Sequence, residues 1–401
     1  MVRNKYLDKN MRYPLAAPSW GGEEIQAIQD VIKTGQYSMN KKVEEFEKEF
    51  ASMFDSKYAV MVNSGSSANL IMVAALFFMK EKSLKPGDEV IVPAVSWATT
   101  YTPLQQYGLH VKFVDIDLGS LNYDLEQLES AISEKTKVIF AVNLLGNPND
   151  FKKINSLIEG KDIILIEDNC ESMGAVLDNK KAGSYGLMGS FSCFHSHHIV
   201  TMEGGVVVTD NEELYHILLC LRSHGWTRNL PQDNLISKKG SDDFKERFRF
   251  ILPGYNVRPI EMFGAIGLKQ LEKLPGMIKI RRNNAEIFQD LFNNNKSFFM
   301  QQEIGNSSWF GFALMIKEGS EISREDIISA LDVAQIDTRP VVAGNIANKE
   351  MISKYFDYSI YGKLKNADYV DSRGFYVGNH SVDIKDNIYY LRDVLKNKFG
   401  N

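Results

Sequence analysis

The chain has 401 residues, with 46 lysines and arginines against 51 aspartates and glutamates, which gives a net charge of −5. This slight acidic excess argues against a general nucleic-acid-binding protein, because such proteins carry a basic excess. Hydrophobic residues make up 44% of the sequence and charged residues 24%, which is typical of a folded globular protein of two or three domains. Cys170, Cys193 and Cys220 form neither a disulfide framework nor a CxxC zinc pattern, which is consistent with a reducing cytoplasm.

Two segments bear on membrane targeting. Met1–Asn10 contains charged residues and no apolar run, so we expect no signal peptide. Leu70–Met79 is the longest apolar run, but ten residues are too few to span a bilayer, and the run predicts a buried helix instead. We therefore expect a cytoplasmic protein with neither a membrane nor a nucleic acid as partner.

Short runs of β-forming residues alternate with helical patterns over the first two thirds of the chain. Two helices are expected within residues 22–54, before the first strand, and later ones at Leu125–Ile132 and Asp150–Ile158. The alternation predicts an α/β fold with a mainly parallel sheet of seven strands, covered by helices on both faces. The predicted strands are Tyr58–Val62, Glu89–Pro93, Val111–Asp115, Val138–Asn143, Ile163–Glu167, Ser190–Phe194 and Gly205–Thr209.

The pattern changes after about Leu268, where the helices become longer and more charged. We therefore expect a large α/β domain of residues 1–267 and a smaller α+β domain of residues 268–401. The elements expected in the smaller domain are a helix over Lys269–Asn295, a strand over Trp309–Ile316, and helices over Arg324–Val333 and Ile384–Lys398.

The residues Asn63–Asn69 read Asn-Ser-Gly-Ser-Ser-Ala-Asn and lie between the first predicted strand and a helix. A turn of small residues at a helix N-terminus offers free backbone N–H groups and the positive end of the helix dipole, which favours phosphate binding. The same pattern also fits a plain capped helix start, and it contains neither a P-loop lysine nor GxGxxG.

Asp168 follows the buried strand Ile163–Glu167. The carboxyl ends of parallel strands are where open α/β sheets bind ligands. There the Asp168 carboxylate could pair with a pyridinium nitrogen or a metal, or it could cap the next helix. The residues alone leave these alternatives open.

Three of the seven histidines, His195, His197 and His198, fall within four positions. On an extended strand, His195 and His197 would point to one side and His198 to the other. Two histidines at this spacing could chelate zinc, but no further Cys/His cluster supplies the remaining ligands, so we expect no metal. The later segments Ser223–Arg228 and Gly254–Pro259 combine glycine with polar and aromatic residues and predict loops.

Taken in this order, these segments resemble the DegT/StrS family of sugar aminotransferases, which have fold type I and use pyridoxal 5′-phosphate (PLP). The resemblance begins at Tyr13 and covers nearly the whole chain. It implies a homodimer whose active site is shared between subunits, with Asn256 reaching the cofactor phosphate of the partner. The cofactor-binding residues that it implies are Gly65, Ser66 and Ser192 at the phosphate, Trp97 over the ring, Asp168 at the ring nitrogen and Glu171 near the ring.

One position departs from the family. Its aminotransferases hold the cofactor covalently through the lysine of Lys-x-x-x-x-x-Glu-Gly-Gly, and counting back six residues from Glu203 gives His197. An imidazole cannot make that link, but it can move protons. With histidine at this position, the sequence resembles a subgroup of the family whose members remove the C3 hydroxyl of a GDP-linked 4-keto-6-deoxy sugar. The resemblance implies non-covalent PLP, its conversion to pyridoxamine phosphate (PMP) by L-glutamate, and release of ammonia and 2-oxoglutarate.

The remaining candidates carry weaker signals. His224 is a second catalytic candidate, and it fits a buried structural histidine equally well. Ser196, Arg228 and Arg339 are candidate substrate contacts, because hydroxyl and guanidinium groups suit phosphates and carboxylates. Alternative functions are a nucleotide-sugar 4-aminotransferase, which the absent lysine disfavours, a non-catalytic protein with the same fold, and a zinc enzyme using His195 and His197.

Overall fold

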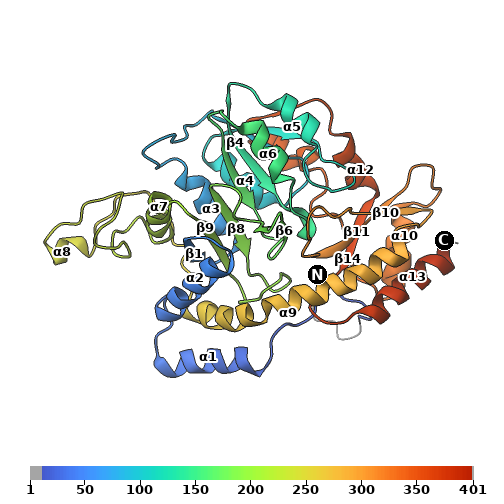
Figure 1. Cartoon of the computed structure of the whole chain (residues 1–401), viewed down its shortest axis with the longest axis horizontal. Coiled ribbons are helices and arrows are strands. Elements are labelled where there is room, and N and C mark those ends of the chain that lie inside the picture. The colour runs from blue at the N-terminus through green and yellow to red at the C-terminus, as the bar shows by residue number, and fades with distance from the viewer. Residues whose placement is uncertain (1–10, 400–401) are drawn as a thin grey trace.

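The computed structural model describes residues 11–399 (Figure 1). The segment Met1–Asn10, for which no signal peptide is expected, lies outside the described residues. The α-helices are α1 (Gly22–Thr34), α2 (Lys41–Met53), α3 (Gly65–Ala75), α4 (Ala98–Gln106), α5 (Leu125–Ala131), α6 (Phe151–Ile158), α7 (Glu212–Arg222), α8 (Asp243–Glu246), α9 (Glu261–Phe292), α10 (Arg324–Val333), α11 (Glu350–Tyr355), α12 (Lys365–Arg373) and α13 (Lys385–Phe399). The strands are β1 (Tyr58–Val62), β2 (Glu89–Pro93), β3 (His110–Val114), β4 (Thr136–Val142), β5 (Ile164–Asp168), β6 (Val176–Leu177), β7 (Lys180–Lys181), β8 (Met188–Ser192), β9 (Gly205–Thr209), β10 (Phe298–Met300), β11 (Gly311–Ile316), β12 (Thr338–Arg339), β13 (Tyr358–Ile360) and β14 (Gly374–Gly378).

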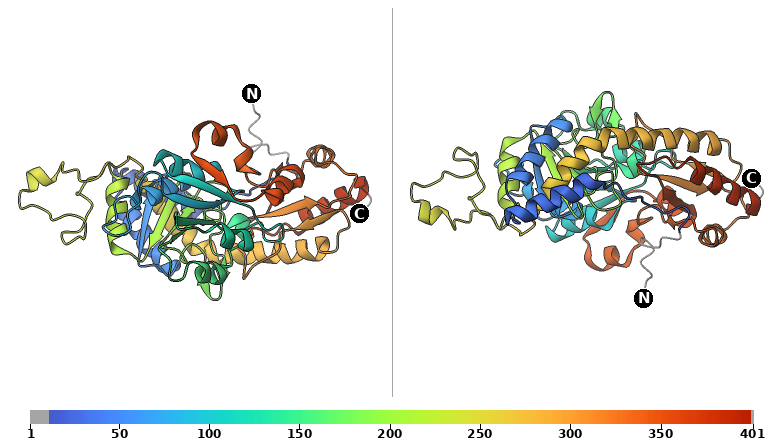
Figure 2. Two further views of the ribbon diagram at one scale, coloured as in Figure 1. Left: turned by 90° about the horizontal axis from the view of Figure 1, so that it is seen from above. Right: turned by 90° about the horizontal axis from the view of Figure 1, so that it is seen from below.

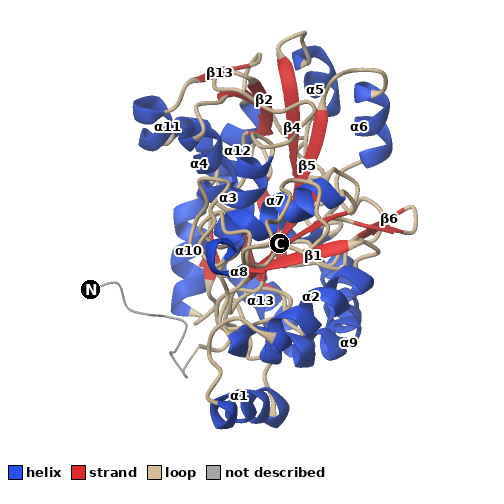
Figure 3. Ribbon diagram, turned by 90° about the vertical axis from the view of Figure 1, so that its left-hand side faces the viewer, coloured by secondary structure: helices blue, strands red, loops and turns tan. Residues whose placement is uncertain are grey.

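The large sheet has the strand order β1-β9-β8-β5-β4-β2-β3-β13 within the described chain. In Figure 3 its labelled strands follow one another from β13 at the top through β2, β4 and β5 to β1. Strand β9 runs antiparallel to both of its neighbours, and the other adjacent strands are parallel. All seven predicted strands are present, each within two residues of its expected bounds. The predicted number of strands, seven, was one too low, because β13 adds an eighth strand beside β3. This strand is only three residues long and follows the predicted large domain by ninety residues, so no local pattern marks it.

Side chains of successive strand residues pack on opposite faces of this sheet. In β2, the buried Val90 and Val92 belong to the core beneath α3, α4 and α7. Ile91, between them, belongs to a separate core beneath α5 and α6. Because both faces are covered, the strand is apolar at consecutive positions rather than at alternate ones.

Helix α9 joins the two parts of the molecule (Figure 2). Its first half packs on α1 and α2, and its second half places Phe288 and Phe292 in the core of a smaller sheet, with the order β10-β11-β14-β12, and of α10 and α13. The predicted start of this helix at Lys269 was eight residues late, since α9 begins at Glu261. The predicted domain boundary after residue 267 therefore falls inside a continuous helix, and the division into two domains stays a prediction.

The segment between α7 and α9 projects away from the rest of the molecule and carries α8 at its tip (Figure 1, Figure 2). The side chains of Phe244 and Phe248 are 79% and 69% exposed there. Exposed aromatic side chains on a projecting segment are typical of surfaces that contact another protein.

Candidate active site at the carboxyl end of the sheet

A cavity of about 330 Å³ opens at the carboxyl ends of β4 and β5, beside the start of α3. The loop after β8 and residues of the smaller sheet complete its wall. The predicted site residues that line it are Gly65, Ser66, Trp97, Asp168, Glu171, Ser192, Ser196, His197 and Arg339.

The phosphate-type turn lies at one end of this cavity. Helix α3 begins at Gly65, and the Ser64 hydroxyl caps it by accepting the Ser67 N–H at 3.1 Å. A Cβ on residue 65 would lie 2.7 Å from the Ser192 Cβ, so only glycine allows β8 to approach the helix start this closely. The hydroxyl groups of Ser66 and Ser192 and the helix N-terminus thus face one small space, which suits a phosphate.

Asp168 is the last residue of β5 and is buried at the floor of the cavity. Its Oδ2 accepts hydrogen bonds from the Asn69 amide at 2.8 Å and the Thr100 hydroxyl at 2.7 Å, while Oδ1 accepts the Cys170 N–H at 3.1 Å. The next element after β5 is the strand β6, so the helix-capping alternative was wrong. Three donors fix the carboxylate in one orientation, as a residue that pairs with a ligand requires.

The sequence analysis did not identify Asn69 and Thr100 as partners of Asp168. Asn69 lies four residues after Gly65 in α3, so helical spacing would have placed both on one face of the helix. Thr100 lies in α4 and meets Asp168 only through tertiary packing, for which the sequence holds no local signal.

The histidine cluster does not lie on an extended strand, so the side-by-side placement of His195 and His197 considered for that case is not found. Strand β8 ends at Ser192, because its partner β9 begins opposite it at Gly205. His195–His198 lie in the intervening loop, where the His197 N–H donates to the Phe194 carbonyl at 2.8 Å. His197 lines the cavity, whereas His198 is buried and its Nε2 contacts the Ser308 carbonyl at 3.3 Å. The exposed His195 is not part of the cavity wall.

The imidazole of His197 lies in an apolar environment, with the positive charge of Arg281 nearby. Its ring lies edge-on to Phe310, with 5.1 Å between ring centroids, and its Nδ1 is buried without a hydrogen-bond partner in the described structure. Burial lowers the pKa of His197 to about 3, and the positive charge of Arg281 acts in the same direction. At neutral pH the ring is therefore uncharged and able to accept a proton.

Glu171 is a second titratable group in the cavity whose pKa is strongly altered. Its Oε2 accepts the Leu145 N–H at 3.1 Å. Burial raises the pKa of Glu171 to about 7, and the negative charge of Asp168 acts in the same direction. Near neutral pH this carboxyl is divided between its protonated and ionised forms.

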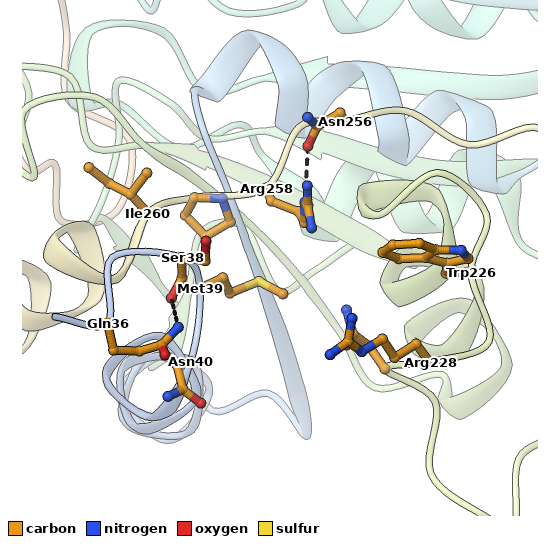
Figure 4. A pocket seen from close by; sticks show the side chains of 11 residues that line it. Gln36, Ser38, Met39, Asn40, Trp226, Arg228, Asn256, Arg258 and Ile260 are labelled. Carbon is orange, nitrogen blue, oxygen red and sulfur yellow. Dashed lines mark hydrogen bonds between the residues drawn. The ribbon is translucent and has the colours of Figure 1, made fainter. Parts of the chain in front are cut away.

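Three predicted site residues lie outside this cavity. Asn256 and Arg228 line a second cavity of about 710 Å³, together with Trp226 and Arg258 (Figure 4). The Arg258 Nε donates to the Asn256 Oδ1 at 3.0 Å. His224 lines neither cavity, and its ring lies edge-on to Trp226 with 5.4 Å between centroids. Within one chain, Asn256, Arg228 and His224 therefore lie apart from the predicted site residues that line the first cavity. Their roles stay predictions.

The described chain gives no support to a metal site or a membrane-spanning helix. Across residues 11–399, no group of three or more His, Cys, Asp or Glu side chains is placed to hold a metal ion. Over the same range, no helix combines the length and the apolar character needed to cross a bilayer.

The mostly parallel sheet, the phosphate-type helix start and the strand-end aspartate together define the class of PLP-dependent enzymes of aminotransferase fold. The sequence model of the DegT/DnrJ/EryC1/StrS aminotransferase family matches residues 18–386, and the chain belongs to this family. It is 58% identical over 387 residues to the GDP-4-keto-6-deoxy-D-mannose 3-dehydratase of Yersinia pseudotuberculosis, covering 96% of this chain and 98% of that protein.

Solved structures agree with this assignment. The structure is similar to the Escherichia coli GDP-4-keto-6-deoxy-D-mannose 3-dehydratase with bound hydrated PLP, with a TM-score of 0.95, 56% identity, and coverage of 96% of this chain and 100% of that one. It is equally similar, with a TM-score of 0.95, 57% identity and the same coverage, to a GDP-4-keto-6-deoxymannose 3-dehydratase with a trapped PLP–glutamate geminal diamine.

Proposed function

We propose that the protein is a PLP- and glutamate-dependent dehydratase that removes the C3 hydroxyl of GDP-4-keto-6-deoxy-D-mannose. Its products would be GDP-4-keto-3,6-dideoxy-D-mannose, ammonia and 2-oxoglutarate. The observation that carries the proposal is His197, a neutral base at the position where the family's aminotransferases have lysine. No lysine is among the residues that line the cavity, so the cofactor would be held without a covalent link.

The cavity has the features that PLP requires. Gly65 leaves space at the helix start for a phosphate, which Ser66 and Ser192 would also contact. Asp168 would pair with the ring nitrogen, and Trp97, which is 55% exposed at the cavity, would cover the ring. When bound, the cofactor supplies an electron sink for the carbon next to the reacting amine.

The protein groups then hold the reactants and move protons. In the first stage, His197 would carry a proton from the α-carbon of glutamate to the C4′ carbon of the cofactor, which leaves PMP and 2-oxoglutarate. In the second stage, His197 would take a proton from C4′ while the sugar loses its C3 hydroxyl. Asp168 would keep the ring nitrogen protonated throughout, and Arg339, Ser196 and Arg228 are proposed substrate contacts.

The active site is proposed to be shared between the subunits of a homodimer in the cytoplasm. Asn256 would reach the phosphate of the partner from the second cavity, and the exposed Phe244 and Phe248 support burial of the projecting segment against another copy. Mixing His197→Asn and Asn256→Ala subunits tests this, because one site in each mixed dimer is then intact. Recovery of about a quarter of the wild-type activity is expected, and no recovery would contradict sharing.

The reaction itself is tested by absorption spectra of the protein with PLP, before and after glutamate, followed by borohydride and intact mass. Conversion of PLP to PMP by glutamate, with no mass added by borohydride to the resting protein, supports a cycle without lysine. Ammonia release from the GDP-sugar then supports the dehydratase. A covalent adduct on a lysine would favour the 4-aminotransferase, and the absence of a PLP band would favour a non-catalytic protein.

A further inference from the structure

We propose that Glu171 is the acid that protonates the departing C3 hydroxyl, while His197 acts as the base. This inference rests on the proposed function, which assigns a proton carrier on the cofactor side and names no separate group for the leaving oxygen. Glu171 and His197 line the same cavity and come from different elements, the turn after β5 and the loop after β8. Two groups on separate elements can act on two different atoms of one bound substrate.

The backbone of Leu145 holds both groups in place. Its N–H donates to the Glu171 carboxyl at 3.1 Å, and its carbonyl accepts the Phe310 N–H at 3.0 Å. The Phe310 ring in turn contacts the His197 ring. Leu145 has a φ of 52°, a left-handed conformation that leucine rarely adopts. Such strained residues persist where the surrounding contacts require them, often at functional sites.

The residue after Leu145 explains how this conformation is maintained. Gly146 has a φ of 97°, and a Cβ there would lie 2.4 Å from the Trp309 backbone nitrogen. Its N–H donates to the Ser172 hydroxyl at 3.0 Å, and its carbonyl accepts the Ser308 N–H at 2.9 Å. The turn is thus tied both to the segment that carries Glu171 and to the segment that carries Phe310.

The chemistry of Glu171 suits proton donation. One carboxyl oxygen accepts the Leu145 N–H, and the structure gives the other oxygen no hydrogen-bond partner among the described residues. Its pKa of about 7 leaves a large share of the carboxyl protonated at neutral pH, whereas burial raises the pKa of the Tyr376 phenol above its usual range and makes it a weaker acid. The titratable and charged side chains that share the cavity with Glu171 are Asp168, Cys170, His197, Glu203, Arg339 and Tyr376.

The elimination balances with these two groups. His197 takes a proton from C4′ of the cofactor, and the electron pair that it leaves moves through the sugar until the C3–O bond breaks. Glu171 gives its proton to the departing oxygen, so water leaves and a carboxylate remains. The proton held by His197 later returns to Glu171 through solvent, so no further reactant is needed. If His197 were both base and acid, its neutral imidazole would have to take the proton from C4′ before it could give one to the departing oxygen. The two proton transfers could then not occur in a single step.

The two stages of the reaction provide the test, because only the second has a leaving hydroxyl. For Glu171→Gln, conversion of PLP to PMP by glutamate should stay within about threefold of wild type, while dehydration followed by ammonia release should fall about a hundredfold or more. Glu129→Gln makes the same change at an exposed carboxylate of α5, outside the cavity wall, and should retain both stages. Equal loss of both stages in Glu171→Gln would assign Glu171 to cofactor binding, and unchanged dehydration would exclude it as the acid.

Two further measurements do not depend on that variant being active. In the infrared spectrum of the cofactor-free protein, a protonated-carboxyl band should titrate with a midpoint near pH 7 and be missing from Glu171→Gln. In wild type, the rate of dehydration should decline above about pH 7, as the acid loses its proton. The absence of the band, or a dehydration rate that stays level well above neutral pH, would overturn the proposal.

Discussion

Replacing His197 with asparagine is the most direct test of how this site works. Asparagine keeps a polar side chain at the cavity wall but cannot take a proton from carbon. Because the imidazole is uncharged at neutral pH, with a pKa of about 3, the substitution removes no charge from the cavity. We therefore expect the bound cofactor and the fold to tolerate the change, while proton transfer is lost.

The expected loss follows from the role of a general base. Such a group contributes about 10²–10⁴-fold to the rate, which corresponds to about 2.7–5.4 kcal/mol of activation free energy. The proposed function gives His197 a proton transfer in each stage. His197→Asn should therefore slow both the formation of PMP from glutamate and the dehydration by about a hundredfold or more, whereas loss of Glu171 should slow only the second.

Stopped-flow absorbance measures the first stage and ammonia release the second. His195→Asn is the matched control, since His195 is exposed and is not part of the cavity wall. It should retain rates within about twofold of wild type, as surface substitutions usually do. Dehydration by His197→Asn within tenfold of wild type would refute the assignment of the base. Loss of the PLP band in that variant would refute the argument that a neutral side chain is being exchanged for another.

Three further predictions test the surroundings of the site. Gly65→Ala should weaken PLP binding about tenfold or more by equilibrium titration, because the new Cβ would clash with the neighbouring strand, whereas Gly276→Ala in α9 has open space and should raise stability by about 0.5–1 kcal/mol. Asn69→Leu removes one of the donors that orient Asp168 and should lower kcat more than cofactor affinity; an unchanged kcat would count against that role. Burial lowers the pKa of His380 to about 4, against about 6.5 in the unfolded chain. Since the unfolded state then binds more protons, stability should fall by up to about 3 kcal/mol as pH drops from 6.5 to 4, and Tm profiles of His380→Gln should show a shallower fall.

The strands of the large sheet were predictable because most are covered on both faces. Consecutive buried residues such as Val90, Ile91 and Val92 give a strong local signal, and the predicted bounds agree within two residues. Strand β13 has no such signal, because its three residues are partly exposed and gain their place only by pairing with β3. The predicted strand Ser190–Phe194 extended two residues too far, because β8 ends at Ser192, where its partner β9 begins, and the sequence of β8 holds no signal for that point.

The candidate site residues also divide into those that a local pattern indicates and those that only tertiary packing brings to the site. Those at the ends of predicted strands and helices, such as Gly65 and Asp168, could be identified because topology alone brings these ends together. Phe310, which packs on His197, comes from the distant C-terminal part of the chain and could not be identified from local pattern. The contacts of Leu145 were also missed, since they are made by backbone groups and depend on a left-handed conformation that nothing in a leucine predicts.

The environment of His197 explains how one substitution can change the chemistry while the fold stays the same. Burial and the positive charge of Arg281 favour an uncharged group at this position. A lysine placed there would also have its pKa lowered, which is what a lysine needs in order to bond to a carbonyl carbon. The same electrostatic field therefore keeps the nitrogen of either residue uncharged, and the two residues differ in whether that nitrogen can also hold the cofactor covalently. Under the proposed function, cofactor retention would then depend on Gly65, Ser192 and Asp168, so substitutions at the phosphate turn should affect PLP binding more than His197→Asn does.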